Sequence, residues 1–273
     1  MYPVLFQFGS FTISSFGFMM VVAFLTANYI LKKDVKADGY DSNIAEDITF
    51  RAAFGGILGA KLYYILENIN TGNAESNIEG FVNIIAGIFT LDLDRLSFGI
   101  QNFGAGLVFL GGLIGGTIAV CLYASKMKIS LLKVSDWVAP VLILGHGIGR
   151  IGCFLVGDDY GIPTDLPWGC SFPNGLPPTN DYVHPTQLYE MLAYFCIFIY
   201  LRRIKNNQKF QGEVIFEYLF LGGFSRFLVE FIRTNDKYIF NLSGAQIISI
   251  VMMLIGSFYL WRNRSIYYQQ NKK

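Results

Sequence analysis

Residues 135–156 read SDWVAPVLILGHGIGRIGCFLV and contain only two charged side chains, Asp136 and Arg150. An α-helix needs about 20 apolar residues to cross the ~30 Å hydrocarbon core of a bilayer. The stretch therefore predicts a membrane-spanning helix. Arg150 lies inside it, and a charged side chain within a membrane is costly enough that it usually marks a functional site.

The composition of the whole chain agrees with this interpretation. The 273 residues are 53% hydrophobic and 15% charged, with a mean hydropathy of +0.42, whereas soluble domains carry about 25% charged residues. The net charge of +1 argues against a nucleic-acid partner. The four cysteines form no CxxC or Cys/His cluster, which argues against a disulfide framework and a zinc site.

Seven apolar segments are candidate spans. The fifth, 188–201, is short unless it begins within the preceding loop. We therefore predict an all-α polytopic membrane protein with seven transmembrane helices. A shorter apolar run at 81–91 is too brief to span, and we expect it at the membrane interface. The predicted spans are 12–31, 44–66, 104–124, 135–156, 188–201, 213–232 and 244–261.

Lys and Arg residues set the expected orientation. Fourteen of the 21 lie in four stretches, at 32–36, 126–133, 202–209 and 262–273, and seven spans place all four stretches on one side. The positive-inside rule makes that side cytoplasmic. We therefore expect the N-terminus outside and the C-terminus in the cytoplasm.

We expect one transmembrane domain over residues 1–273, with extracytoplasmic segments at 67–103 and 157–187. The first is rich in asparagine at its start, which suggests flexibility there. The second holds six of the eight prolines, and proline restricts φ and interrupts helices. Because loops on a rigid scaffold often carry function, 157–187 is a candidate part of a site.

Closely spaced glycines surround Arg150. Their GxGxxG spacing matches a dinucleotide fingerprint, but that motif needs a βαβ unit, whereas this segment continues a membrane helix. Gly145, Gly149 and Gly152 instead predict a small-residue face that a helix or a lipid can approach closely.

Arg150 itself suits phosphate recognition, because a guanidinium is a planar fork of donors. His146 lies one turn earlier on the same helical face. Asp158 and Asp159 follow the helix, where their carboxylates can orient the fork.

A second charged cluster is Arg226, Glu230 and Arg233. The spacing i, i+4, i+7 predicts that all three lie on one helical face. Glu230 can then pair with both arginines and offset the cost of burying them.

Two further motifs complete the pattern. In His184-Pro-Thr-Gln-Leu-Tyr-Glu190, proline marks the start of the fifth span, and Gln187 and Glu190 point polar groups toward the outer mouth of the bundle. The glycine-rich stretch 104–116 has i, i+4 spacing typical of helix packing.

Together, two arginines near the outer leaflet, Arg150 and Arg226, beside glycine-lined grooves, suggest a site for an anionic lipid head group.

These motifs, in this order, resemble those of the prolipoprotein diacylglyceryl transferase family. The matching residues are Ser135–Pro140, Gly149-Arg150-x-Gly152-x-Phe154, Gly157–Gly161, His184–Glu190, Arg226-x-x-x-Glu230-x-x-Arg233 and Gly111–Gly115. The resemblance covers essentially the whole chain.

The resemblance implies a multi-pass enzyme of the bacterial inner (cytoplasmic) membrane. Such an enzyme transfers diacylglycerol from phosphatidylglycerol to the thiol of the lipobox cysteine in a preprolipoprotein signal peptide, releasing glycerol phosphate. Its partners are then phosphatidylglycerol, the preprolipoprotein and membrane lipids, with no nucleic acid. No metal or organic cofactor is expected.

The resemblance also implies roles for individual residues. Arg150 and Arg226 match the arginines that bind the lipid phosphate, and Glu230 and Arg233 match their supporting pair. Asp158 stands where the family usually has glutamate. The remaining residues expected to bind substrate are Gly152, Cys153, Gly161, His184, Gln187, Tyr189 and Glu190.

Four positions depart from the family pattern. Leu110 stands where many members have histidine, and Cys153 stands where asparagine is usual. Phe16 and Gly222 each stand at a position where tyrosine is common. The phosphate-binding arginines remain, while their hydrogen-bonding neighbours are fewer.

We expect Arg150 and Arg226 to stabilise the departing phosphate electrostatically, oriented by Asp158 and Glu230. The thiol must lose its proton to become a nucleophile. With Leu110 at the usual histidine position, we hypothesise that His146 is the base.

Two alternatives remain at this point. The chain could be a divergent paralogue that transfers a phospholipid-derived group to another acceptor, which the four departures favour. It could also be a non-catalytic lipid-binding membrane protein.

Overall fold

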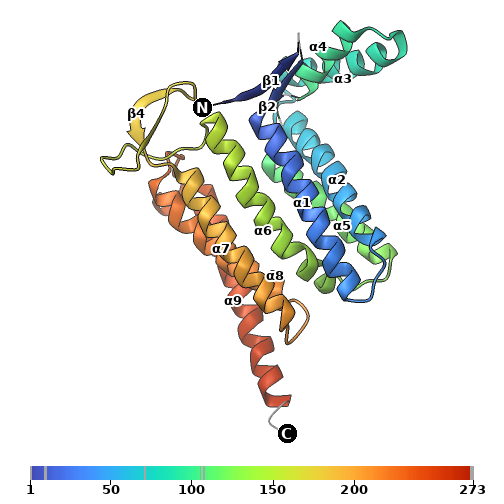
Figure 1. Ribbon diagram of the computed structural model, residues 1–273, viewed down its shortest axis with the longest axis vertical. Helices are drawn as coiled ribbons and strands as arrows, with labels where there is room; N and C mark the ends of the chain where they lie inside the picture. Colours follow the sequence, from blue (N-terminus) through green and yellow to red (C-terminus); the bar gives the residue numbers. More distant parts are fainter. Residues whose placement is uncertain (1, 9–10, 71, 105, 107, 271–273) are drawn as a thin grey trace. The chain divides into compact units, whose positions relative to one another are not determined.

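The computed structural model describes residues 2–8, 11–70, 72–104, 106 and 108–270. Over these residues the chain is mostly helical, as predicted (Figure 1). The helices are α1 Ser15–Ala37, α2 Asn43–Glu67, α3 Gly72–Thr90, α4 Leu93–Gly104, α5 Phe109–Lys126, α6 Leu131–Val156, α7 Thr186–Asn206, α8 Glu213–Val229 and α9 Gly244–Gln270.

Two small sheets were not predicted by the all-α assignment. Strand β1 (Val4–Phe8) pairs with β2 (Phe11–Ser14), and β3 (Cys170–Phe172) pairs antiparallel with β4 (Thr179–Val183). Strands of three to five residues are too short to show a clear alternating pattern in sequence.

Each predicted span overlaps one long helix. Helix α7 begins at Thr186 and reaches 21 residues, because it starts within the loop that precedes the apolar run. Helix α8 ends at Val229 and continues as a 3-10 turn, η1, over Glu230–Ile232. In the part of the chain that the structure describes, three helices are long and apolar enough to cross a membrane: α1, α6 and α9.

The segment 67–103 is largely helical rather than an asparagine-rich loop. Helices α3 and α4 form a close hairpin, in which a Cβ at Gly99 would lie 2.6 Å from Ile84 N. The short apolar run 81–91 belongs to α3 and the turn that follows it.

The chain divides into two compact units. One contains α2–α5, and the other contains α1, α6–α9 and the β3–β4 sheet. Within the first unit, α2 and α5 pack through glycines: a Cβ at Gly55 would lie 2.8 Å from Gly115 O, and one at Gly59 would lie 2.8 Å from Gly115 Cα. The stretch 104–116 is therefore a packing motif, since small residues let membrane helices approach closely.

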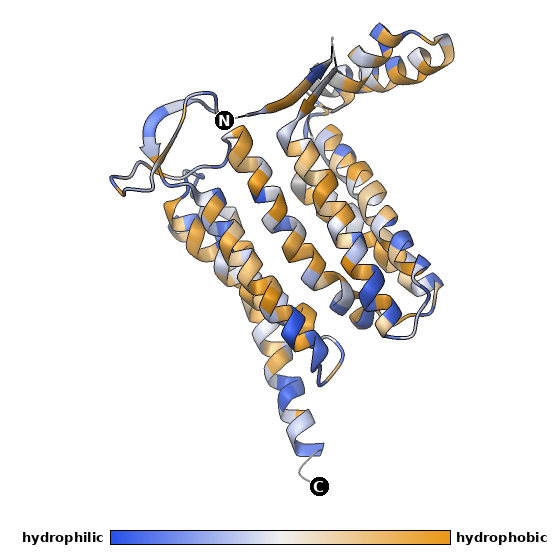
Figure 2. Ribbon diagram, in the orientation of Figure 1, coloured by the Kyte–Doolittle hydropathy of each residue, from blue (hydrophilic) through white to orange (hydrophobic). Residues whose placement is uncertain are grey.

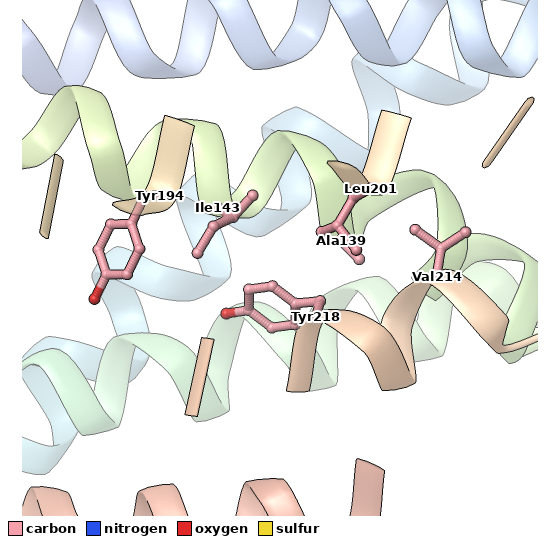
Figure 3. Packing of buried hydrophobic residues seen from close by; sticks show 6 residues of the cluster. All are labelled: Ala139, Ile143, Tyr194, Leu201, Val214 and Tyr218. Carbon is pink, nitrogen blue, oxygen red and sulfur yellow. The ribbon is translucent and has the colours of Figure 1, made fainter. Parts of the chain in front are cut away.

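The second unit packs α6, α7 and α8 around a common core (Figure 3). Figure 2 shows hydrophobic residues along most of these helices and hydrophilic residues near the α7–α8 connection. The core residues are Ala139, Ile143, Tyr194, Leu201, Val214 and Tyr218.

Polar contacts hold the start of α6 and α8 together. The Asp136 carboxylate accepts hydrogen bonds from Gly212 N at 2.6 Å and Ile215 N at 2.9 Å, so a residue of α6 caps the N-terminus of α8. Trp137 Nε1 donates to Asp38 Oδ2 at 2.7 Å. Asp136 and Trp137 of the Ser-Asp-Trp motif thus align α6 with its neighbours. This alignment sets where Arg150 on α6 lies relative to Arg226 on α8.

Candidate active site

Arg150 on α6 and Arg226 on α8 reach the same carboxylate. Glu190, on α7, is fully buried; its Oε2 lies 2.8 Å from Arg150 Nε, and its Oε1 lies 2.7 Å from Arg226 Nη1. Both guanidiniums are therefore within reach of a single two-oxygen anion. The arginine side chains remain 18% and 22% exposed, so neither is sealed from a ligand.

Arg233 joins this cluster by a different route from the one predicted. The prediction that Arg226, Glu230 and Arg233 share one helical face is wrong, because α8 ends at Val229 and Arg233 has an extended backbone (φ −89°, ψ 160°). Its Nη1 nevertheless lies 3.6 Å from Glu190 Oε2, and its Nε lies 3.8 Å from Glu230 Oε2.

Glu230 forms a second ion pair with Arg226, besides that of Glu190. Its Oε2 lies 2.9 Å from Arg226 Nη2, which agrees with the predicted i, i+4 pair. Its Oε1 accepts hydrogen bonds from Asn235 Nδ2 at 2.6 Å and Ser243 Oγ at 2.8 Å. These two partners come from the connection to α9 and carried no signal in the sequence.

Of the two carboxylates predicted to orient Arg150, Asp159 makes the contact. Asp159 Oδ2 lies 2.7 Å from Arg150 Nη1, and its Oδ1 lies 2.5 Å from Arg233 Nη2. Burial would raise the pKa of Asp159, but the guanidiniums of Arg233 and Arg150 outweigh it, so the pKa lies below the ordinary 3.8. Asp159 is therefore the ionised partner of both arginines.

Asp158 faces Cys153 instead. Burial raises the pKa of its carboxyl above 3.8, although a hydrogen bond with Cys153 acts in the opposite direction. The predicted role of Asp158 in orienting Arg150 thus has no direct contact behind it among the described residues.

The start of α7 holds this acidic pair in place. Thr186 Oγ1 donates to Asp159 O at 2.6 Å, and Gln187 Nε2 donates to Asp158 O. Gln187 is fully buried. Asp159 has a φ of +60°, which is unfavourable for a non-glycine residue, so these two bonds stabilise a backbone that would otherwise relax.

His184 and Tyr189 form a separate group at the loop. Tyr189 Oη lies 3.2 Å from His184 Nδ1 and accepts a hydrogen bond from Trp168 Nε1 at 2.8 Å. These bonds tie α7 to the loop 157–187, whereas Glu190, from the same motif, points into the arginine cluster.

Two predicted glycines are required by close packing. A Cβ at Gly161 would lie 2.5 Å from Ile232 O, and one at Gly152 would lie 3.1 Å from Phe16 Cα. Gly161 also forms a backbone bridge with Arg233. Gly152 therefore lets α1 approach α6, and Gly161 lets the loop approach the residues that follow α8.

Cys153 contacts the charged cluster through Arg150. It is buried, and its Sγ accepts a hydrogen bond from Arg150 Nη1 at 3.6 Å. Ligand atoms of Cys153, Asp158 and Asp159 lie within 4.8 Å of one another. Arg150 already contacts Cys153 and Asp159, and its positive charge would oppose a cation, so this group does not favour a metal site.

His146 lies near the cluster but next to a ring. Its centroid is 6.1 Å from that of Tyr194, and Tyr194 Oη donates to Glu190 Oε1 at 3.1 Å. Tyr194 thus contacts both the His146 ring and Glu190.

Phe16 and Gly222, which stand where tyrosine is common in the family, lie in different surroundings. Phe16 is 40% exposed on α1. At Gly222 a Cβ would lie 3.7 Å from Tyr218 Cε2, and the Tyr218 hydroxyl points toward the Tyr194 end of the core (Figure 3). A tyrosine one helical turn earlier thus lies beside the position where one is missing.

The site as a whole is an array of three guanidiniums and three carboxylates among the described residues, in which Glu190, Glu230 and Arg233 are buried and the Asp159 side chain is 42% exposed. A buried charge without a partner is costly, so each group holds the others in fixed positions. The arrangement presents several N–H donors toward one point, which is the geometry that binds a phosphate.

Comparison with known proteins gives a consistent result. A family model described as prolipoprotein diacylglyceryl transferase matches residues 3–262. A Clostridium tetani protein named phosphatidylglycerol–prolipoprotein diacylglyceryl transferase is 35% identical over 260 residues, covering 94% of this chain and 96% of that protein. Proteins of the same name from Aeromonas salmonicida (32% identical; 95% and 89% covered) and Thermotoga maritima (29%; 92% and 81%) also match. The chain therefore belongs to the prolipoprotein diacylglyceryl transferase family.

Proposed function

We propose that this protein transfers the diacylglyceryl group of phosphatidylglycerol to the lipobox cysteine thiol of a preprolipoprotein, forming a thioether and releasing glycerol phosphate. The observation that carries the proposal is the convergence of Arg150 and Arg226 on Glu190, at 2.8 and 2.7 Å. It supports joint binding of one phosphate by two guanidiniums.

The reaction breaks the bond between the glycerol carbon of the diacylglyceryl group and the phosphate oxygen. Arg150 and Arg226 stabilise the charge that develops on the phosphate as it leaves. Arg233, Glu230 and Asp159 hold the two arginines in position. Glu190, Glu230 and Arg233 are buried, which limits the access of water to their side of the cluster. Water would otherwise hydrolyse the lipid.

The other residues predicted from the sequence line or support this site in the proposal. Cys153 contacts Arg150, whereas Gly152 faces α1 and lets it approach α6. Gly161, His184, Gln187 and Tyr189 shape the loop through which the acceptor peptide arrives. Asp158 supports the loop rather than the arginine fork, and His146 is the candidate base that the sequence predicts.

We propose that the protein lies in the inner membrane of a bacterium and crosses it seven times. Its N-terminus is then outside and its C-terminus is in the cytoplasm. Seven long helices overlap the seven apolar segments, and the basic stretches alternate as the positive-inside rule requires. The family match extends over both units, which supports a single transferase domain.

Mass spectrometry of a lipobox peptide tests the function. The purified protein, incubated with phosphatidylglycerol and the peptide, should add one diacylglyceryl group to the cysteine. A peptide with serine at that position is the matched control and should stay unmodified. If the lipid is consumed while the peptide stays unchanged, the acceptor is a different one, as the departures at Leu110 and Gly222 would allow. Lipid binding without turnover would instead indicate a non-catalytic protein.

A further inference from the structure

Glu190 occupies the place where the lipid phosphate is proposed to bind. Its two oxygens face Arg150 and Arg226, and the side chain is fully buried. A phosphodiester also presents two unesterified oxygens. When the phosphate binds these arginines, it therefore competes with Glu190 for the same N–H donors.

The charge of the cluster makes this competition consequential. Each of the three guanidiniums already contacts a carboxylate of the cluster, and Asp158 also interacts with Arg150 and Arg233, so the phosphodiester adds a negative charge that none of these guanidiniums is left to balance. A buried carboxylate that loses its cationic partners becomes more basic. Uptake of one proton by the cluster restores the balance, and Glu190 is the carboxylate that shares both arginines with the phosphate.

Glu190 also has an oxygen suited to receive that proton. Its Oε1 accepts a hydrogen bond from Tyr194 Oη at 3.1 Å. Its Oε2 accepts no hydrogen bond of regular geometry from the described residues, although Arg150 Nε lies 2.8 Å away. Once Arg150 turns to the phosphate, Oε2 is the oxygen with an unused lone pair.

We propose that Glu190 is the base that accepts the proton of the substrate thiol when the lipid phosphate binds; this inference rests on the proposed function. The thiolate then forms the carbon–sulfur bond with the terminal glycerol carbon of the diacylglyceryl group. The carbon–oxygen bond breaks, its electron pair stays on the phosphate oxygen, and Glu190 returns the proton to the departing glycerol phosphate.

Neighbouring groups are less suited to this step. Asp159 keeps its 2.5 Å contact with Arg233 when Arg150 turns to a phosphate. This makes it a weaker base than Glu190, which lies 3.6 Å from Arg233. Glu230 keeps the hydrogen bonds of Asn235 and Ser243 after Arg226 turns to a phosphate. Protonation of His146 would place a positive imidazolium near Arg150, on the same face of α6.

The Glu190→Gln variant tests the proposal, because it keeps the size of the side chain and removes its basicity. With a lipobox cysteine peptide, kcat should fall by about 10²- to 10⁴-fold, the usual contribution of a general base. The KM for phosphatidylglycerol should stay the same or fall, since a competitor for the arginines has lost its charge.

A selenocysteine peptide separates base catalysis from positioning. A selenol is ionised at neutral pH and needs no base, so Glu190→Gln should recover most of its lost rate on this acceptor. Glu230→Gln, which also loses a carboxylate paired with Arg226, should be impaired equally on both peptides. An equal loss for Glu190→Gln on both peptides, or a normal rate on cysteine, would overturn the proposal.

The wild-type protein provides the remaining measurements. It should show a solvent deuterium isotope effect on kcat/KM with the cysteine peptide and none with the selenocysteine peptide, even if Glu190→Gln fails to fold. The same effect with both acceptors would contradict the base assignment. A wild-type protein that modifies neither peptide would instead overturn the proposed function itself.

Discussion

At the scale of single residues, Arg150 uses its fork in three directions. Its Nε faces Glu190 at 2.8 Å, while its Nη1 contacts Asp159 at 2.7 Å and Cys153 at 3.6 Å. A lysine has one ammonium group and cannot reproduce this planar arrangement. The site therefore depends on the shape of the cation as well as on its charge.

Arg150→Lys should lower kcat/KM for thioether formation. Loss of one hydrogen bond to a charged group costs about 1.5–3 kcal/mol, which corresponds to roughly 10- to 100-fold in rate. Initial rates with purified protein measure the change. Near-normal turnover would show that the guanidinium does not contact phosphate through two N–H groups.

The two histidines provide a direct comparison of base candidates. The hypothesis from the sequence predicts that His146→Ala cuts transfer far more than His184→Ala does. The Glu190 proposal predicts that His146→Ala keeps most of its kcat, because Glu190 rather than the imidazole accepts the thiol proton. The same thioether assay on both variants decides between the two bases.

Asp159 should make stability depend on acid pH. Its pKa is lowered in the folded state from 3.8, so its stabilising contribution is present above pH 3.8 and is lost as the pH falls through the folded-state value. Asp159→Asn should therefore melt at a lower temperature than wild type at neutral pH. The difference should narrow below pH 3.8 in detergent-solubilised protein; a constant difference would contradict this account.

At the scale of elements, apolar length and Gly/Pro punctuation were enough to predict the seven helices that overlap the apolar segments, but not α3 and α4, which lie in 67–103. The end of α8 was not predictable, because Arg226-Phe-Leu-Val-Glu-Phe-Ile-Arg233 reads as a regular helix. The backbone bridge between Gly161 and Arg233 draws Arg233 into an extended conformation, and a contact across 72 positions leaves no local signal.

The acidic partner of Arg150 was also not predictable from the local sequence. Asp158 and Asp159 are adjacent and chemically alike, so the sequence identified the pair but not the partner of Arg150. Hydrogen bonds from Thr186 and Gln187 to their carbonyl groups fix which carboxylate faces the arginines. Asn235 and Ser243 were missed as supports of Glu230 for the same reason, since both are ordinary loop residues until the chain folds.

Packing of α1 on α6 predicts different responses from two glycines on one helical face. Gly152→Ala should destabilise the protein by about 1–3 kcal/mol, the usual cost of overpacking, because its Cβ would lie 3.1 Å from Phe16 Cα. Gly149→Ala, whose Cβ would lie 3.9 Å from Met20 Sδ, is the matched control and should be tolerated. Equal thermal shifts for both variants would contradict this packing.

At the scale of the whole molecule, the distribution of charge predicts an orientation. A cysteine placed at Asp165 in the proline-rich loop should react with a membrane-impermeant maleimide in intact cells. One placed at Lys209, between α7 and α8, should react only after the membrane is opened. Both experiments require a background lacking the four native cysteines, and the opposite labelling pattern would reverse the proposed topology.

The proposed transfer depends on two arginines from different helices binding one lipid phosphate. A structure of the protein with phosphatidylglycerol bound would show this contact. We expect Arg150 and Arg226 N–H groups within about 3 Å of oxygens on the same phosphate, with Glu190 displaced from at least one of the two arginines. Guanidiniums that contact separate lipids, or that leave the phosphate untouched, would contradict it.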